Sequence, residues 1–217
     1  AYRGLPAGAL NPSLLPIVTK RVLMDRFDDW VTDPALDLAG VTAFLADRDQ
    51  IGEPYLGRYV IWKSSGSTGE PGIYVQDGEA LETSDALMAV HLDPARFTAA
   101  QTWRIAARGG RIALIAATGD HFAGIASWHR LTRNRPWMAA RSFSIMDPLP
   151  QLVAQLNAYR PAFVASYPTL LALLADERKA GRLAIDPVGL WSGGECLPAS
   201  VRAELEAYGQ GLTDKPE

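Results

Sequence analysis

Two short apolar runs enclose a polar loop in the stretch Tyr59-Val60-Ile61-Trp62-Lys63-Ser64-Ser65-Gly66-Ser67-Thr68-Gly69-Glu70-Pro71-Gly72-Ile73-Tyr74-Val75. The flanking runs are rich in β-branched and aromatic residues, and we expect a strand, a tight loop and a second strand. Glycine lets a backbone approach a ligand closely, and successive N–H groups with hydroxyls can hold an anion such as polyphosphate. The local residues alone leave open whether this loop binds phosphate or is a solvent-exposed turn.

The loop does not have the pattern of a Walker P-loop. That motif requires Gly, four residues and then Gly-Lys-Ser/Thr leading into a helix. Here Pro71 and a second apolar run follow instead. Any phosphate would therefore be held by a hairpin loop rather than by the N-terminus of a helix.

The composition narrows the class of protein. The 217 residues suit one large domain or two small ones, and 48% hydrophobic residues are enough for a packed core. A net charge of −3 argues against non-specific nucleic-acid binding. The single Cys196 excludes an internal disulfide, and neither a transmembrane run nor a signal peptide is visible. We expect a soluble, cytoplasmic protein that binds neither nucleic acid nor membrane, and a homodimer stays open.

The first half of the chain, residues 1–110, is expected to be helical around the polar loop. Helices are predicted over residues 20–27, 41–48, 77–91 and 98–108 from apolar spacing and capping residues. Asp77 is a good N-cap for the third of these helices. Gly109-Gly110 is expected to end the fourth.

From residue 111 onward, strands and helices are predicted to alternate. Strands are expected over residues 111–116, 138–145, 162–167 and 188–192, with helices over residues 149–159, 168–179 and 198–208. This alternation is typical of βαβ units and predicts an α/β fold with a mostly parallel, doubly wound sheet. Ligands bind outside the carboxyl ends of such strands. We therefore expect the loops Thr118-Gly119-Asp120-His121, Ser166-Tyr167-Pro168 and Ser192-Gly193-Gly194-Glu195 to meet at one edge.

Several segments resemble adenylate-forming enzymes, the family of acyl-CoA synthetases, adenylation domains and luciferase-like ligases. Ser64-Ser65-Gly66-Ser67-Thr68-Gly69-Glu70-Pro71 resembles their phosphate-binding signature, and Gly193-Gly194-Glu195-Cys196-Leu197 resembles their Gly-Gly-Glu-Pro-Leu segment. Residues 159–169 resemble the segment before it, which ends in Tyr-Pro-Ser. Residues 15–27 are similar to the phenylacetate-CoA ligase branch, which includes the coenzyme F390 synthetases. The resemblance covers essentially the whole chain, in order and spacing.

This resemblance implies the large-domain fold of the family, with residues 1–110 as its N-terminal portion and 111–217 as its βαβ portion. It also implies an acid–thiol ligase: a carboxylate attacks the α-phosphate of ATP, pyrophosphate leaves, and coenzyme A takes the acyl group. The implied cofactors are ATP, Mg²⁺ and coenzyme A. Ser64, Ser65, Gly66, Ser67, Thr68 and Gly69 would hold the β- and γ-phosphates, and Gly193, Gly194 and Glu195 would line the adenosine pocket. The candidates for the acyl pocket, which leans toward an aromatic carboxylate, are His121, Phe122, Tyr167 and Pro168.

Plainer interpretations remain for several of these residues. Gly193-Gly194 could be a structural turn between strand and helix, His121 could be a surface-loop histidine, and Tyr167 could be a core aromatic. Cys196 stands where the family commonly has Pro. We expect it to be a small buried residue rather than a catalytic thiol, because no base is visible near it.

The sequence also departs from the family. Gly72 stands where many members have Lys, and no Tyr-Gly-x-Thr/Ser-Glu segment follows Gly209. The later ribose-binding Asp and the small C-terminal domain with the catalytic Lys are likewise missing. The polar tail, residues 210–217, lies where another strand would be expected. We therefore expect an N-terminal piece of the large domain that is catalytically poor alone. A non-catalytic nucleotide-binding or interaction module, or an adenylating enzyme with an amine or carrier-protein acceptor, stays open.

Overall fold

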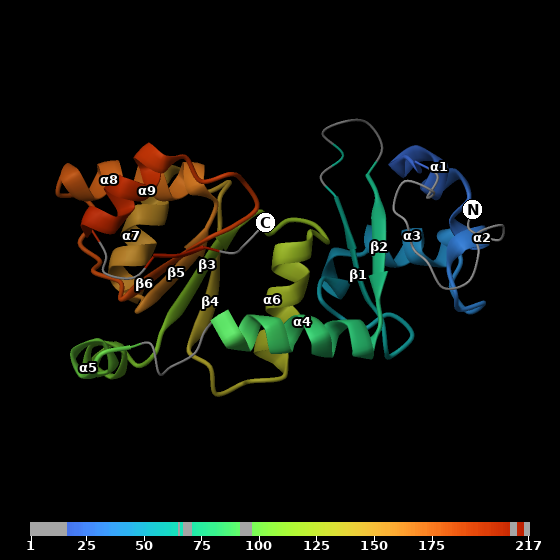
Figure 1. Cartoon of the computed structure of the whole chain (residues 1–217), viewed down its shortest axis with the longest axis horizontal. Coiled ribbons are helices and arrows are strands. Elements are labelled where there is room, and N and C mark those ends of the chain that lie inside the picture. The colour runs from blue at the N-terminus through green and yellow to red at the C-terminus, as the bar shows by residue number, and fades with distance from the viewer. Residues whose placement is uncertain (1–16, 65, 67–70, 92–96, 209–211, 215–217) are drawn as a thin grey trace.

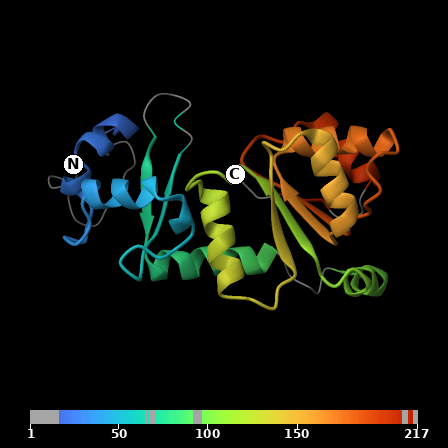
Figure 2. The same ribbon diagram turned by 180° about the vertical axis from the view of Figure 1, so that it is seen from behind.

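The computed structural model describes residues 17–64, 66, 71–91, 97–208 and 212–214. Within them the chain forms a two-stranded hairpin and a five-stranded sheet (Figure 1). Helix α6 (Ala123–Arg133) stands between the hairpin and the sheet in both ribbon views (Figures 1 and 2). Helix α6 contacts both β1 of the hairpin and β3 of the sheet and so links the two parts.

Short helices pack beside the hairpin in the first half of the chain. They are α1 (Lys20–Asp25), α2 (Phe27–Trp30), α3 (Leu38–Ala46) and the 3₁₀ helix η2 (Arg48–Gln50). The predicted helix over 20–27 is divided because Arg26 leaves the helical conformation, with φ −128° and ψ 32°. The predicted helix over 41–48 begins earlier, because the Asp37 carboxylate accepts a hydrogen bond of 2.7 Å from the Gly40 N–H.

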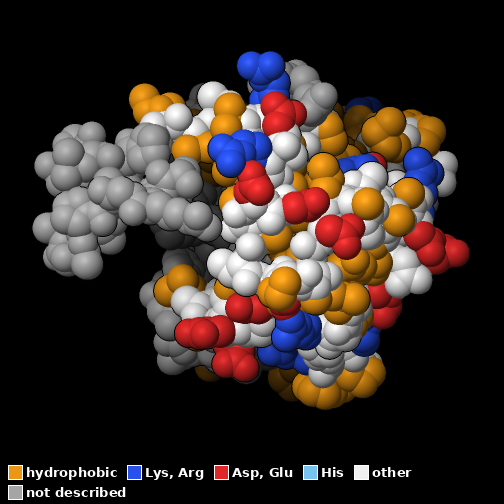
Figure 3. Space-filling model, turned by 90° about the vertical axis from the view of Figure 1, so that its right-hand side faces the viewer, with side chains coloured by type: hydrophobic (Ala, Val, Ile, Leu, Met, Phe, Trp, Pro, Cys, Tyr) orange, Lys and Arg blue, Asp and Glu red, His pale blue; other side chains and the backbone are white. Residues whose placement is uncertain are grey.

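These helices and the hairpin share a small hydrophobic core. Its buried members are Met24, Phe27, Leu36, Val41, Leu45, Tyr59 and Ile61. The core fixes α1 and α3 against the hairpin, because burial of each large apolar side chain contributes about 1.5–3 kcal/mol. On the side that carries these helices, acidic and basic side chains are interspersed rather than gathered by sign (Figure 3).

The predicted strand–loop–strand segment is confirmed as an antiparallel hairpin. Strand β1 (Val60–Lys63) pairs with β2 (Ile73–Gln76), with Lys63 opposite Ile73. The Ser64 N–H donates to the Gly72 carbonyl at 2.9 Å, and the Gly72 N–H donates to Ser64 Oγ at 2.8 Å. These two hydrogen bonds close the base of the loop.

Two capped helices lead from the hairpin to the sheet. Asp77 caps α4 (Gly78–His91) by accepting from the Ala80 N–H at 3.0 Å. Helix α5 (Ala99–Ala107) begins with a capping box between Thr98 and Gln101. It ends before Gly109 and Gly110, both at positive φ (60° and 61°), as the sequence predicted.

The five strands of the sheet are all parallel. Their spatial order is β4 (Ala140–Ser144), β3 (Ile112–Ala116), β5 (Phe163–Ser166), β6 (Gly189–Ser192) and β7 (Leu212–Asp214). Helices α6, α7 (Leu149–Tyr159), α8 (Pro168–Lys179) and α9 (Ala199–Tyr208) connect them. The predicted alternation of strands and helices is confirmed, and for α7 and α8 the predicted boundaries agree to the residue.

Strand β7 lies in the polar tail, residues 210–217, where the fold leads one to expect another strand. Residues 212–214 pair in parallel with β6, with Leu212 opposite Leu190. The apolar pattern gives no sign of this strand. The ladder is made by backbone N–H and C=O groups, so a polar segment can extend a sheet beside an available edge.

The order of the strands makes the sheet doubly wound. The step from β3 to β4 runs one way across the sheet, whereas the steps from β4 to β5, β6 and β7 run the other way. Right-handed crossovers then place α6 on one face and α7, α8 and α9 on the other. The core agrees: buried residues of β3, β4 and β5 pack with α7, α8 and α9, and Ile125 and Ala126 of α6 are buried outside that cluster.

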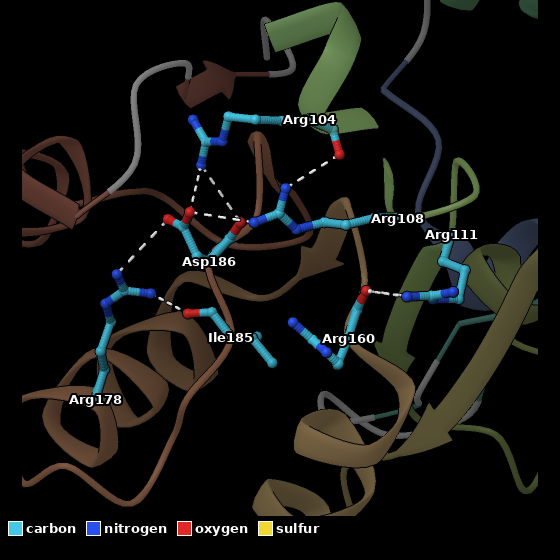
Figure 4. A network of polar contacts seen from close by, with 7 residues as sticks. All are labelled: Arg104, Arg108, Arg111, Arg160, Arg178, Ile185 and Asp186. Atoms are coloured by element: carbon cyan, nitrogen blue, oxygen red, sulfur yellow. Dashed lines mark hydrogen bonds and ion pairs between the residues drawn. The ribbon is translucent and has the colours of Figure 1, made fainter. Parts of the chain in front are cut away.

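An arginine network braces the amino edge of the sheet, away from the loops that follow the strands (Figure 4). Asp186, which precedes β6, pairs with Arg104 and Arg108 at 2.7 and 3.2 Å and with Arg178 at 3.7 Å. Nearby, the Arg111 guanidinium donates to the Arg160 carbonyl. The network ties α5 and α8 to the segment that enters β6.

Candidate functional site

The loops that follow β3, β5 and β6 meet at the carboxyl edge of the sheet, as the sequence predicted. The three strands are parallel neighbours, so they end on the same side. Ser166 Oγ, at the end of β5, donates to the Ile115 carbonyl of β3 at 2.9 Å. The Gly193 N–H donates to the Ser166 carbonyl at 3.2 Å. The ends of the strands are thus held together by direct hydrogen bonds.

This edge is also the topological switch point of the sheet. The loop after β3 leads to α6 on one face, and the loop after its neighbour β5 leads to α8 on the opposite face. In open α/β sheets, ligands bind outside the carboxyl ends of the strands, where two adjacent loops diverge in this way.

The hairpin is attached to this edge through Lys63. The Lys63 N–H donates to the His121 carbonyl at 2.8 Å, and residue 63 forms a parallel bridge with Phe122. The Lys63 ammonium lies 2.8 Å from Asp120 Oδ2. The candidate phosphate loop therefore begins one residue after its connection to the loop that follows β3.

Lys63 and Asp120 form a charged pair at the attachment. Burial opposes the charged form of Asp120 and by itself would raise its pKa. Hydrogen bonds from Lys63 and from the His121 N–H, together with the Lys63 charge, outweigh this effect of burial. The pKa of Asp120 is therefore lowered below its ordinary value of 3.8. Asp120 therefore stays ionised and paired at neutral pH. Sequence reasoning missed this pair, although Lys63 is the only charged residue in the apolar run before the loop.

His121 is fully buried, so the interpretation as a surface-loop histidine is wrong. Its Nε2 lies 2.8 Å from the Asp47 carbonyl, and its ring lies 5.4 Å from that of Phe44. Its Nδ1 has no hydrogen-bond partner within the described residues. The imidazole links the end of α3 to the sheet edge. Phe122 is half-buried and precedes α6 as its N-cap residue.

The turn after β6 is fastened to the start of α8. Thr169 donates its N–H and its hydroxyl to a Glu195 carboxylate oxygen at 3.2 and 2.8 Å. Gly194 has φ +81°, and a Cβ there would lie 2.9 Å from Cε1 of Tyr167. Both the backbone conformation and the close aromatic ring require glycine. Tyr167 is half-buried and Pro168 is buried in the first turn of α8.

Cys196 is exposed, so the expectation of a small buried residue is wrong. Gly194 and Glu195, which precede it, are also exposed. The positive φ of Gly194 turns the chain outward after β6, which carries the next residues away from the core.

The predicted site residues thus form two groups on neighbouring loops. Ser64 lies beside Lys63, which contacts the loop of His121 and Phe122, and Tyr167 and Pro168 lie with Gly193, Gly194 and Glu195 at the start of α8. Gly66 is described and has φ 71°. Ser65, Ser67, Thr68 and Gly69 lie outside the described residues.

The described part of the chain contains neither a membrane span nor a ready metal centre. No helix there is long and apolar enough to cross a membrane. No group of three or more His, Cys, Asp or Glu side chains in the same residues is arranged to hold a metal ion.

Comparisons with known proteins connect this geometry to one fold. No protein-family model and no curated protein matches the chain. Among solved structures, it resembles 2-hydroxyisobutyryl-CoA ligase in complex with 2-HIB-AMP, with a TM-score of 0.50 at 18% identity over 94% of this chain and 38% of that one. VinN in complex with L-aspartate gives a TM-score of 0.47 at 15% identity, over 71% of this chain and 35% of that one. An acyl-CoA synthetase (AMP-forming)/AMP-acid ligase II-like protein from Dyadobacter fermentans gives a TM-score of 0.40 at 18% identity. The match covers 77% of this chain and 41% of that one.

The chain spans about two-fifths of the length of these structures. At identities below one fifth, the likeness shows the fold alone. The parallel strand order and the topological switch point of the sheet agree with this likeness in fold. The chain is therefore an α/β protein with a fold like that of 2-hydroxyisobutyryl-CoA ligase, of which it spans 38%.

Proposed function

We propose that this chain is the ATP-binding part of an enzyme that activates a carboxylate as an acyl-adenylate and transfers it to coenzyme A. We place it in the phenylacetate-CoA ligase-like branch. One observation carries the proposal: the Ser/Thr/Gly hairpin is attached through Lys63 to the loop after β3, at the switch point of the sheet. A phosphate-binding loop attached at this position would lie close to the edge where such sheets bind nucleotides.

The chemistry of the two groups of residues fits a nucleotide. Gly66 at positive φ and the hydroxyls of the loop provide donors for phosphate oxygens. Exposed Gly194 backbone beside the Tyr167 ring offers a flat surface for a purine. When bound, ATP supplies the pyrophosphate leaving group, and Mg²⁺ offsets the charge that develops on it. The chain's own residues bind and orient: Lys63 and Asp120 hold the hairpin, and buried His121 fills the space between α3 and the sheet edge.

Phe122 and Tyr167 are half-buried aromatic side chains on neighbouring loops of this edge. Two aromatic side chains at this edge support an aromatic carboxylate as the substrate. Pro168 is buried beside Tyr167 and fixes its backbone direction. An amine or a carrier-protein thiol is the alternative acceptor to coenzyme A.

A non-catalytic nucleotide-binding module is the second candidate. It is favoured by Gly72, which stands where many adenylate-forming enzymes have Lys. Removal of one group that stabilises transition-state charge costs about 10²–10³ in rate. Such a chain could bind ATP without turning it over.

The first test measures ATP binding to the 217-residue chain by equilibrium dialysis. We expect Gly66→Ala to weaken binding, because its backbone lies in the loop at φ 71°. Gly57→Ala is the matched control: Gly57 has φ 73°, lies outside the loop, and a Cβ added to it would meet only open space. Both changes strain a left-handed backbone by about 1 kcal/mol, so only a specific loss in Gly66→Ala supports the site. Absence of ATP binding by the wild type would contradict the proposal.

Carboxylate-dependent exchange between ATP and pyrophosphate separates the two candidates. It is measured on the protein encoded by the reading frame that contains this chain, with a panel of aryl and short-chain acids. Exchange with an aryl acid supports the ligase. ATP binding without exchange across the panel supports the non-catalytic module instead.

A further inference from the structure

Strand β4 is the outermost strand on one side of the parallel sheet, since within the described residues it pairs with β3 alone. The Ile112 N–H of β3 donates to the Ala139 carbonyl, just before β4 begins. In a parallel ladder the bonding residues of a strand alternate. The backbone groups of Ala140, Ser142 and Ser144 therefore point away from β3.

Four of these outward backbone groups have no hydrogen-bond partner in the part of the chain that the structure describes. The Ala140 N–H donates to the Met138 carbonyl, and the Ser144 carbonyl accepts from the Asp147 N–H. The groups that remain are the Ala140 carbonyl, the Ser142 N–H, the Ser142 carbonyl and the Ser144 N–H. Acceptor and donor alternate along the edge, which is the pattern to which a further strand can pair.

The space beside this edge is open. A cavity of about 490 Å³ lies between β4 and the carboxyl-terminal half of α6, the helix next to β4 in both ribbon views (Figures 1 and 2). Trp128 and Thr132 of α6 line one side, and Ala140 and Ser142 of β4 line the other. Ala140 and Ser142 share one face of the sheet, as alternate residues do, and their side chains are too small to fill the space.

The charge at this edge is positive. The exposed Arg141 guanidinium lies 5.0 Å from the centre of the Phe143 ring, and among the described residues no carboxylate pairs with it. Arg133 and Glu53, which also line the cavity, balance each other at 2.6 Å. His129 adds no charge at neutral pH, because burial lowers its pKa below 6.5. A segment that carries an acidic side chain would complement Arg141.

We propose that the outer edge of β4 binds an extended, acidic peptide segment of a partner protein as an added strand between β4 and α6. The outward backbone groups pair with the peptide main chain. Side chains alternate between the two faces of a strand, so one contacts Arg141 and the next enters the cavity. Because α6 forms the far wall, one extended segment fits there, whereas a second copy of this chain would bring a whole sheet against α6. This site is independent of the ATP site proposed above.

A random library of peptides of about nine residues, selected on the immobilised 217-residue chain, supplies the probe. We expect the enriched peptides to share an acidic residue and to lack proline next to it, because proline has no N–H for the ladder. Enrichment of no peptide, or of peptides without an acidic residue, would overturn the inference.

Variants of β4 then test the binding of an enriched peptide. Ser142→Pro removes one outward N–H and leaves the ladder with β3 intact, because an edge strand tolerates proline on its outer side. We expect its Kd to rise about threefold to tenfold, the loss typical of one hydrogen bond. Ser142→Ala keeps this N–H and should retain the affinity that Ser142→Pro loses. Equal losses in the two variants would contradict pairing through the backbone.

The role of Arg141 is tested in the same way. Arg141→Gln should raise the Kd about tenfold and weaken its salt dependence, whereas Arg141→Lys keeps the charge and most of the affinity. Arg21→Gln, which removes an exposed arginine from α1, is the matched control and leaves the Kd unchanged. An unchanged Kd in Arg141→Gln would overturn the preference for an acidic peptide.

N-methylated peptides test the pairing on the wild-type chain, even if Ser142→Pro folds poorly. Methylation of the peptide N–H groups that face β4 should abolish binding, and methylation of those between them should not, with a period of two residues. Equal effects at every position would overturn strand addition. Sedimentation tests the other occupant: a wild-type dimer that Ser142→Pro dissociates would show that a second copy covers this edge instead of a peptide.

Discussion

Replacing Asp120 with Asn tests whether the charged pair with Lys63 holds the hairpin to the sheet. The amide keeps the shape of the carboxylate, and its oxygen can still accept from the His121 N–H, which lies 2.8 Å from Oδ1 of Asp120 in the wild type. The Lys63 ammonium, whose side chain is 24% exposed, loses its counter-charge. We expect Asp120→Asn to lower the free energy of unfolding at pH 7.

The structure sets the size of this effect. At 2.8 Å the gross attraction is about 6 kcal/mol with an effective dielectric constant of about 20. Most of it is offset by desolvation, by side-chain entropy and by solvent screening, because about a quarter of each side chain is exposed. The net loss should be about 1.5–3 kcal/mol, the range for a hydrogen bond to a charged group.

The pH dependence gives the signature of this pair. Because folding lowers the pKa of Asp120, its contribution is fully present above the ordinary value of 3.8 and is lost as the pH falls through the lower folded value. The difference between the wild type and Asp120→Asn should be constant from pH 7 to about pH 5 and should shrink below about pH 4.

Urea unfolding followed by circular dichroism at pH 7, 5 and 3 measures these differences. Asp29→Asn is the control, because its ion pair with Arg26 is mostly exposed (64% and 70%) and should contribute less than about 0.5 kcal/mol. Equal stability of the wild type and Asp120→Asn at pH 7 would refute the reasoning. A difference that persists unchanged at pH 3 would also refute it.

Three further substitutions test the fold. Leu156→Ala removes a fully buried side chain from the core under α7 and should cost about 2–5 kcal/mol in urea unfolding; a loss below about 1 kcal/mol would contradict that packing. Gly52 has φ +75°, and a Cβ added by Gly52→Ala would overlap Cβ of His129. We therefore expect a lower Tm and at least about 2 kcal/mol of destabilisation. An unchanged Tm would show that the two residues are not in contact. Asp186→Ala leaves three guanidinium groups without their shared carboxylate. We expect the free energy of unfolding to fall by about 1–2 kcal/mol, and by less at high salt, which screens the repulsion between the guanidinium groups. A loss that does not depend on salt would argue against an electrostatic cause.

Local signals predicted the helices and strands of the second half well. Pro168 marks the start of α8, and apolar spacing marks the extent of α7. Both signals lie within a few neighbouring residues, and the helices of the structure have the predicted limits. The hairpin was predicted for a similar reason, since β-branched and aromatic residues flank a loop rich in Gly, Ser and Thr.

The errors occurred where a residue's surroundings come from distant segments. His121 looked like a loop residue by its neighbours in sequence, yet Phe44 and the Asp47 carbonyl bury it. Cys196 looked small and buried, yet the turn at Gly194 carries it outward. Strand β7 was expected from the position of the tail in the fold but had no apolar pattern of its own, and its backbone pairing with β6 makes it a strand.

The amino-acid sequence alone determined the order of elements, the parallel sheet and the edge at which its polar loops meet. These follow from periodicity, caps and turn residues, which act over a few positions of chain. Tertiary structure alone decided that Lys63 joins the hairpin to Asp120 and that Lys20 lies over Gly72. Such contacts depend on how separate helices and strands pack against one another, and no local pattern encodes which distant side chain will fill a given space.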